Sequence, residues 1–261
     1  MNLDLTGKTA LVTGSTAGIG LATATGLARQ GATVVVNGRT QQRVDAAIAS
    51  IAAAVPGART IGVAADGTTA DGAARMFAAV PEVDVLVNNL GGVTAVKPFA
   101  ALDDADWQRS WERNVLSAVR FTRHYLPPMR ARDWGRVVFV ASESGIQPPL
   151  EFMDYGVAKA GVIALSRGIA ESLVRCGVTA NAVLPGPTLA EGLGRRIAES
   201  GQDVAAFSET FFATRRPTSL IQRFETVEEV AAMIVFVCTP AASAVHGAAL
   251  RVDGGVIKGA F

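Results

Sequence analysis

The sequence predicts an α/β protein built on one doubly wound parallel sheet of about seven strands, with helices on both faces. Short β-branched segments alternate with longer alanine-rich segments along the whole chain. The β-branched segments are almost continuously apolar, which is typical of strands that are buried on both faces. No linker rich in Pro, Gly or Ser divides the 261 residues, so we expect a single domain over residues 1–261.

The predicted strands share one pattern, a short apolar run that stops at a polar or glycine-rich turn. They lie at residues 9–13, 33–37, 60–64, 83–88, 136–141, 178–184 and 249–252. Helix-length segments fall between them at residues 18–30, 41–54, 70–79, 104–130, 155–175 and 227–239. Gly31 and Gly177 follow two of these helices, where a helix end favours a residue with positive φ. This alternation with short connections predicts right-handed crossovers and a parallel sheet.

The segment 185–225 interrupts the alternation. It contains a short helix-like piece at residues 191–200 and then an aromatic patch of Phe207, Phe211 and Phe212. Because so long an interruption of a compact domain is usually functional, we expect a substrate-binding loop or lid, with Phe207 and Phe211 against the substrate. The alternative is a surface excursion whose phenylalanines pack on the fold.

Composition excludes several classes of protein. Only 18% of the residues are charged and the net charge is +1, without a basic block, which argues against nucleic-acid binding. The apolar run at residues 231–238 is far shorter than the roughly 20 residues of a membrane span. The first residues, MNLDLTGK, lack the basic and apolar regions of a signal peptide, and two cysteines make neither a disulfide framework nor a metal site. We therefore expect a cytoplasmic protein without a metal.

A glycine-rich turn follows the first predicted strand and leads directly into a helix. Such a turn lets the backbone approach a phosphate, and the helix N-terminus supplies N–H donors to it. Its position predicts a Rossmann-type dinucleotide site. The residues expected at the cofactor are Gly14, Ser15, Thr16, Gly18, Ile19 and Gly20.

The end of the second predicted strand distinguishes NADP from NAD. The sequence there is Asn37-Gly38-Arg39-Thr40, without an acidic residue for the ribose hydroxyls of NAD. A guanidinium binds a phosphate with two hydrogen bonds, so Arg39 predicts NADP(H), while NAD(H) stays possible. The alternative is that Arg39 only begins the next helix at the surface.

Two more turns lie at the carboxyl ends of predicted strands, the edge at which such sheets bind ligands. Asp66 and Gly67 follow the third strand, and Asn88 and Gly91 lie in the turn after the fourth. We expect Asp66 to accept a hydrogen bond from the adenine and the other three to shape the adenosine site. Ordinary turn chemistry is the alternative for each.

Ser142, Tyr155 and Lys159 form the strongest candidate site. Tyr155 and Lys159 are four residues apart on a predicted helix, so they share a face, and Lys159 is one of only four lysines. The lysine cation, together with the positively charged nicotinamide of an oxidised cofactor, favours the phenolate and is expected to lower the Tyr155 pKa from about 10. Ser142 ends the fifth strand, from which its hydroxyl can hold a substrate oxygen against Tyr155. The alternative is a solvated helix face.

These residues resemble the short-chain dehydrogenase/reductase family over nearly the full length of the chain. The matching pieces are residues 13–20, Asp66, residues 88–91, Asn114, Ser142, Tyr155, Lys159, Asn181, Pro185, Gly186 and residues 252–255. The resemblance implies an enzyme that moves a hydride between the nicotinamide and a carbonyl carbon, while Tyr155 moves the proton.

The resemblance also implies roles for single residues. Asn114 would hold a water in a proton relay from Lys159, and Lys159 would bind the nicotinamide ribose. Pro185, Gly186 and Thr188 would lie against the nicotinamide. The sequence departs from the family pattern at Ala17, where many NADP-dependent members have a second basic residue, so the preference for NADP depends on Arg39.

The substrate and the partners are less closely defined. The chain is most similar to 3-oxoacyl-carrier-protein reductases, with Ser144 expected beside Ser142 and Tyr155 at the substrate. Arg132 and Arg175 lie where such enzymes dock a carrier protein, so the carbonyl or alcohol substrate is either free or carrier-bound. The family implies a homotetramer or dimer. Two alternatives are an NAD-dependent alcohol dehydrogenase for a cyclic or aromatic substrate, and a non-catalytic protein that senses the cofactor.

Overall fold

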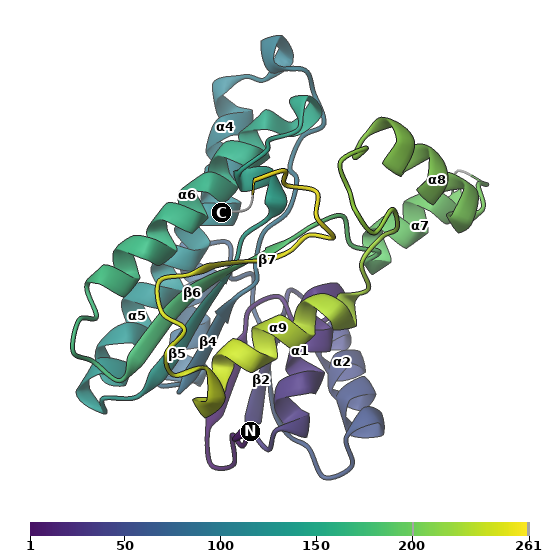
Figure 1. Cartoon of the computed structure of the whole chain (residues 1–261). Coiled ribbons are helices and arrows are strands. Elements are labelled where there is room, and N and C mark those ends of the chain that lie inside the picture. The colour runs from purple at the N-terminus through teal and green to yellow at the C-terminus, as the bar shows by residue number, and fades with distance from the viewer. Residues whose placement is uncertain (200, 260–261) are drawn as a thin grey trace.

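The strands of the computed structural model, which describes residues 1–199 and 201–259, form one parallel sheet (Figure 1). Their order is β3-β2-β1-β4-β5-β6-β7. The bounds are β1 (Thr9–Val12), β2 (Thr33–Gly38), β3 (Arg59–Ala64), β4 (Val85–Asn88), β5 (Gly135–Val140), β6 (Val178–Pro185) and β7 (Ala249–Val252). The direction of winding reverses between β1 and β4, which places a crevice at the carboxyl ends of these strands. The predicted doubly wound parallel sheet is confirmed.

Helices cover both faces of the sheet, and each layer has its own apolar core. One layer contains α1 (Gly18–Arg29), α2 (Gln41–Ala54) and α9 (Val227–Cys238). The other contains α3 (Ala70–Ala79), α5 (Ser117–Ala131) and α6 (Met153–Glu171). Alternate strand residues serve opposite layers, since Leu11 packs toward α5 whereas Ala10 and Val12 pack toward α1. Burial on both faces explains why the inner strands are continuously apolar, whereas the edge strands β3 and β7 are partly exposed.

The prediction of one continuous helix at residues 104–130 is wrong, because the segment is interrupted. It is divided into α4 (Asp104–Trp111), a π-helical turn (Glu112–Leu116) and α5. Within this turn, the Asn114 side chain donates to the Ser110 carbonyl at 2.9 Å, so it uses the acceptor that a regular helix gives to a backbone N–H. The irregularity therefore lies at the residue that the sequence analysis placed in the active site.

The segment between β6 and α9 contains two helices, α7 (Glu191–Glu199) and α8 (Val204–Thr214). The sequence analysis predicted only the first, and Ser200, the predicted end of that helix, lies outside the described residues. Asp203 begins α8, because its carboxylate accepts the N–H groups of Ala205 and Ala206. Figure 1 shows α7 and α8 beyond the carboxyl ends of the strands, across from the start of α6.

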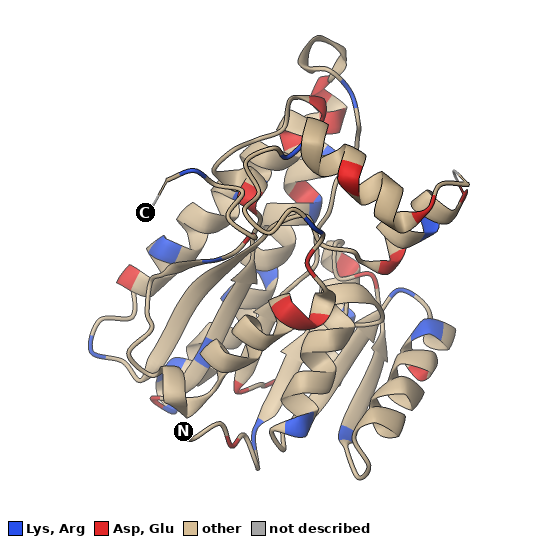
Figure 2. Ribbon diagram, turned by 45° about the vertical axis from the view of Figure 1, so that its right-hand side comes forward, with Lys and Arg blue, Asp and Glu red and all other residues tan. Residues whose placement is uncertain are grey.

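Charge is distributed without a dominant sign on the ribbon, as Figure 2 shows for the helices and loops. Among the described residues, none of the helices has both the length and the hydropathy that crossing a membrane requires.

Candidate active site

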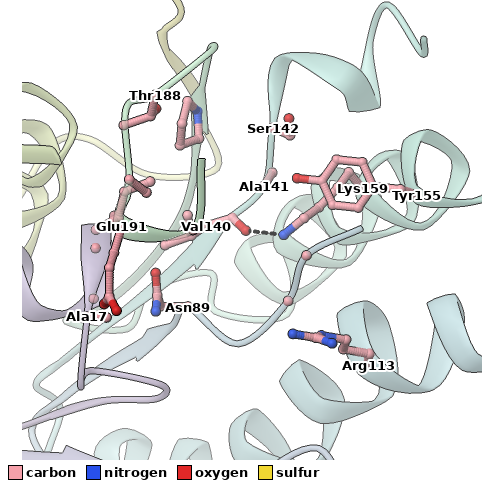
Figure 3. A pocket seen from close by; sticks show the side chains of 18 of the residues that line it. Ala17, Asn89, Arg113, Val140, Ala141, Ser142, Tyr155, Lys159, Thr188 and Glu191 are labelled. Carbon is pink, nitrogen blue, oxygen red and sulfur yellow. Dashed lines mark hydrogen bonds between the residues drawn. The ribbon is translucent and has the colours of Figure 1, made fainter. Parts of the chain in front are cut away.

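A cavity of about 550 Å³ opens at the carboxyl ends of the strands, between the start of α1 and the start of α6 (Figure 3). It combines residues from the glycine-rich turn, the turn after β4, the ends of β5 and β6, and the first turns of α6 and α7. The predicted site residues among its lining are Gly18, Ile19, Gly20, Gly91, Ser142, Tyr155, Lys159, Pro185, Gly186 and Thr188. The fold thus brings together residues that are far apart in the sequence.

The first part of the glycine-rich turn is fastened to β2. Asn37 accepts the Gly14 N–H at 3.1 Å through its side chain, and its backbone N–H donates to the Ser15 hydroxyl at 2.9 Å. Ser15 is fully buried, and Thr16 packs against Gly38. Both residues therefore hold the turn against β2 and do not line the cavity. The helix that follows begins at Ala17, which has no capping side chain, so the N–H groups of its first turn remain free to bind an anion.

Asp66 and Gly67 lie outside the cavity lining, at the end of β3. Asp66 accepts the backbone N–H of Thr68 at 3.1 Å and its hydroxyl at 2.7 Å. Burial opposes ionisation of Asp66, but these hydrogen bonds and the charges of Arg39 and Arg113 hold its pKa below the ordinary value. Asp66 is therefore an ionised acceptor at the end of its strand.

The two asparagines after β4 have different environments. Asn88 is buried and donates to the Thr122 hydroxyl at 3.0 Å, on the side of α5. Asn89, which the sequence analysis did not single out, lines the cavity and donates to the carbonyls of Thr13 and Gly14 at 2.9 and 3.2 Å. It joins the turn after β4 to the glycine-rich turn.

Ser142, Tyr155 and Lys159 converge on one wall of the cavity (Figure 3). Ser142 lies two residues after the end of β5, and its side chain lies beside that of Tyr155. Lys159 is one turn further along α6, with its Nζ 5.7 Å from the Tyr155 ring centroid. This Nζ donates to the Val140 carbonyl at 2.7 Å, which fixes the ammonium next to the end of β5. The predicted constellation is present in the geometry.

Asn114 lies behind this wall and is almost fully buried. Its side chain accepts the Gly92 N–H at 2.9 Å and donates to the Gly92 carbonyl at 3.2 Å. Gly91 lies between Asn114 and Lys159, because a Cβ at Gly91 would be 2.7 Å from Asn114 Oδ1 and 3.0 Å from Lys159 Nζ. Only glycine lets this turn pass between the two side chains.

Burial shifts the pKa values of Tyr155 and Lys159 in opposite directions. Burial raises the Tyr155 pKa to about 12, although the hydrogen bond with Ser142 lowers it. In the protein alone, burial of the phenol decides the Tyr155 pKa. The lowering expected from Lys159 together with an oxidised nicotinamide stays a prediction for the enzyme with its cofactor. Burial, with the charge of Arg113, lowers the Lys159 pKa to about 8. At neutral pH Tyr155 holds its proton and Lys159 is a cation that loses its proton readily.

Three arginines line the cavity, and Arg39, which the sequence analysis selected, is not among them: they are Arg43, Arg113 and Arg195. Arg39 is exposed and lies outside the lining, whereas Arg43, one turn further along α2, lines the cavity beside Ala17 and Gly18. Glu191, at the start of α7, pairs with Arg43 at 3.6 Å and with Arg195 at 3.3 Å. Arg43, Glu191 and Arg195 line the cavity together with Ala17 and Gly18, where the glycine-rich turn leads into α1. The spacing of four residues between Arg39 and Arg43 is the sequence signal that was missed.

The predicted substrate contacts are distributed differently. Phe207 and Phe211 lie outside the cavity lining and pack with each other and with Phe224, at ring-centroid distances of 5.0 to 6.1 Å. Ser144 also lies outside the lining, and its hydroxyl donates to Glu143 at 3.2 Å. Glu143 in turn accepts two N–H groups of Arg216, at 2.9 and 3.1 Å, in a buried ion pair between the Ser142 loop and the segment 185–225.

Two other expectations concern the surface and metals. Arg132 pairs with Glu82 and Asp84, so its charge is already compensated by the chain.

Within residues 1–199 and 201–259, no group of three or more His, Cys, Asp or Glu side chains is arranged to hold a metal ion.

Comparison with known proteins places this geometry among oxidoreductases. A family model described as short chain dehydrogenase matches residues 8–201. The oxidoreductase YvrD of Bacillus subtilis (strain 168) is 45% identical, over 99% of both chains. D-beta-hydroxybutyrate dehydrogenase of Cupriavidus necator is 36% identical, over 96% of this chain and 98% of the relative. The crystal structure of L-sorbose reductase from Gluconobacter frateurii with NADPH and L-sorbose has a TM-score of 0.90 at 31% identity, over 99% of this chain and 100% of that one.

Proposed function

The chain belongs to the short-chain dehydrogenase/reductase family, and we propose that within it the protein is an NADP(H)-dependent ketoreductase for a small polar ketone. Members of the family act at CH–OH and C=O groups, so this chain is an oxidoreductase of that type. The single observation that carries the finer proposal is the convergence of Ser142, Tyr155 and Lys159 on a cavity that begins at a helix N-terminus.

The residues of the cavity fit a nicotinamide dinucleotide. The free N–H groups at the start of α1 suit its pyrophosphate, and Lys159 suits the hydroxyls of the nicotinamide ribose. When bound, the nicotinamide supplies or accepts the hydride at the carbonyl carbon. Ser142 holds the carbonyl oxygen, and Tyr155, protonated at neutral pH, gives that oxygen its proton. Lys159 and Asn114 then return a proton to Tyr155.

Selection of NADP over NAD is supported by the cations at the Ala17 end of the cavity. Arg43 lines it, and Arg195 approaches the same carboxylate of Glu191, so two guanidinium groups face one acid. A 2′-phosphate supplies the second negative charge that these groups lack. The NADPH bound to L-sorbose reductase is consistent with this choice.

Replacement of Arg43 with alanine is expected to raise the Kd of NADPH about 10–100-fold and to leave that of NADH within two-fold. Hydrogen bonds to a charged group contribute about 1.5–3 kcal/mol each, and only NADPH has the phosphate. Titration of each cofactor by its fluorescence measures both values. Arg39→Ala is the companion variant, and Arg29→Ala, on the far end of α1, is the control. Equal losses for the two cofactors would assign Arg43 to the fold instead.

The proposed substrate is a ketone with further polar groups. Phe207 and Phe211, which were expected against the substrate, pack on Phe224 outside the cavity lining. The compared proteins are named for L-sorbose and for hydroxybutyrate, which are both small and polar. A panel of keto sugars, keto acids, their 3-oxoacyl thioesters and cyclic ketones, assayed with NADPH and NADH, tests the proposal. Turnover of cyclic or aromatic substrates with NADH alone would overturn it, and tight NADPH binding without turnover would favour a cofactor sensor.

We also propose that the protein assembles as a homotetramer. Trp111 on α4 and Val157 on α6 are 43% and 45% exposed, although both are large apolar residues in neighbouring parts of the fold. A charged content of 18% is low for a chain that exposes its whole surface to water. Light scattering at micromolar concentration is expected to give four times the 27.0 kDa of one chain. A mass of 27.0 kDa would contradict the proposal.

A further inference from the structure

Glu225 closes the segment 185–225, and its side chain is buried beneath the turn that follows β6. Only 3% of its surface is exposed. Its Oε2 lies 3.4 Å from the Thr188 hydroxyl and accepts the Gly186 N–H at 3.0 Å, a donor that it shares with the Val252 carbonyl at 2.8 Å. Its backbone accepts the Leu189 N–H at 2.8 Å and donates to the Pro187 carbonyl at 2.9 Å. One residue thus holds all four positions of the turn.

The other carboxyl oxygen of Glu225 shows how closely the turn approaches this side chain. Oε1 is buried and has no hydrogen-bond partner among the described residues. A Cβ at position 186 would be 2.5 Å from this oxygen and 2.8 Å from Asp253 Cα, so only glycine permits the turn to rest on Glu225. The turn and the carboxyl group therefore fit each other without space for a side chain or a water between them.

The charged groups around Glu225 leave it without a cation of its own. Asp253 follows β7 and uses its carboxylate on the N–H groups of Gly255 and Ile257 and on Arg251, at 3.7 Å. On the side of α9, Arg223 pairs with Glu229, and the described residues include no ion pair to Glu225. Burial, together with the charges of Asp253 and Glu229, raises the Glu225 pKa to about 7, against the hydrogen bonds from Gly186 and Thr188. Glu225 is therefore a buried acid whose charge changes near neutral pH.

We propose that Glu225 is a positioning residue for the cofactor, which holds the turn at residues 186–188 in the conformation that meets the nicotinamide end. The proposal rests on the proposed function, because it takes that turn to be the nicotinamide contact. Thr188 has one hydroxyl proton, and its acceptors are the Gly186 carbonyl at 3.0 Å and Glu225. Either bond uses that proton, so the oxygen lone pairs of Thr188 are left for an N–H donor such as a carboxamide.

Ionisation of Glu225 strengthens this arrangement. A carboxylate accepts a hydrogen bond more strongly than a neutral carboxyl group, so the turn is held more firmly when Glu225 is charged. Affinity for the nicotinamide half of the cofactor is then expected to rise with pH through about 7. The adenosine half, at the far end of the cavity, is not expected to respond to Glu225.

Glu225→Ala, Glu225→Gln and the control Glu228→Gln test the proposal in the full chain. Glu228 is an exposed acid on the first turn of α9, so its change removes the same charge without touching the turn. The Kd of NADPH and of adenosine 2′,5′-bisphosphate are measured from pH 6 to pH 9, with thermal unfolding as the check on folding. We expect Glu225→Ala to weaken NADPH about 10-fold at pH 8 and adenosine 2′,5′-bisphosphate less than two-fold.

The pH series separates positioning from a structural role. Wild type and Glu228→Gln are expected to bind NADPH more weakly at pH 6 than at pH 8, and Glu225→Gln is expected to show no such change. Parallel losses for NADPH and adenosine 2′,5′-bisphosphate, or unchanged NADPH binding in both Glu225 variants, would overturn the proposal. A wild type that binds NADPH and reduces no ketone would instead refute the proposed function, and the binding comparison would still decide the role of Glu225.

Discussion

Tyr155→Phe is expected to lower kcat for ketone reduction by about 10²–10⁴-fold and to leave the Kd of NADPH within a few-fold of wild type. The phenylalanine keeps the ring on the wall of the cavity but cannot give the carbonyl oxygen a proton. Because the ring packs against Phe152 and its hydroxyl is the only polar atom lost, the fold is expected to be retained. Steady-state kinetics together with a fluorescence titration of NADPH measures the two effects separately.

The chain offers a matched control, since its only other tyrosine is Tyr125. Tyr125 is fully buried and donates its hydroxyl to the Val80 carbonyl at 2.7 Å, in the core beneath α3 and α5. Tyr125→Phe removes the same atom and is expected to lower the free energy of unfolding by about 1–3 kcal/mol without changing kcat. Turnover by Tyr155→Phe at a rate near wild type would refute the role given to Tyr155.

Lys159→Met is expected to have the largest effect in the molecule, a loss of about 10³-fold or more in kcat/KM, since it removes both a cofactor contact and a proton relay. The methionine has nearly the same length, so it occupies the same space among buried neighbours. It leaves the Val140 carbonyl without its donor, and thermal unfolding shows how much of the loss is structural. Lys258→Met, at an exposed position near the end of the chain, is the control and is expected to behave as wild type.

The pH dependence of the wild type tests the same residue. Burial and Arg113 lower the Lys159 pKa to about 8, so the cation is present below about pH 8 and is lost above it. At saturating NADPH, the rate of ketone reduction is therefore expected to be constant between pH 6 and 7 and to fall above about pH 8. Lys159→Arg keeps its charge throughout this range, so whatever activity it retains should not show that fall. A wild-type rate that is constant up to pH 10 would contradict this assignment.

The inner strands were predicted almost residue for residue because burial on both faces leaves an uninterrupted apolar run in the sequence. Tyr155, Lys159 and Ser142 were found for a related reason, since helix spacing and the position after a strand are both visible in one dimension. What the sequence does not show is which way a side chain turns. Asn88 and Asn89 are adjacent and chemically identical, yet only Asn89 lines the cavity. The Asn88 side chain instead bonds with Thr122, which is distant in sequence.

Three other differences have the same origin in tertiary contacts. The π-helical turn contains Asn114, whose side-chain amide bonds with Gly92 in the loop after β4. Helix propensity along the sequence does not include this contact. Arg43 enters the cavity because Glu191 reaches it from a segment more than a hundred residues later. The Tyr155 pKa depends on burial of the phenol, which the neighbouring lysine alone does not reveal. In each case the deciding partner is remote in sequence.

The segment 185–225 has an aromatic core of its own, because the ring contacts of its phenylalanines, up to and including Phe224, are with one another. Two of its ion pairs to the rest of the protein, from Glu191 to Arg43 and from Arg215 to Glu151, join partly exposed side chains, whereas Arg216 and Glu143 are buried. Dissolved salt screens exposed charges over a Debye length of about 8 Å at physiological ionic strength and reaches buried charges much less. A rise in ionic strength is therefore expected to weaken the two outer ion pairs of this segment more than its buried attachment beside Ser142.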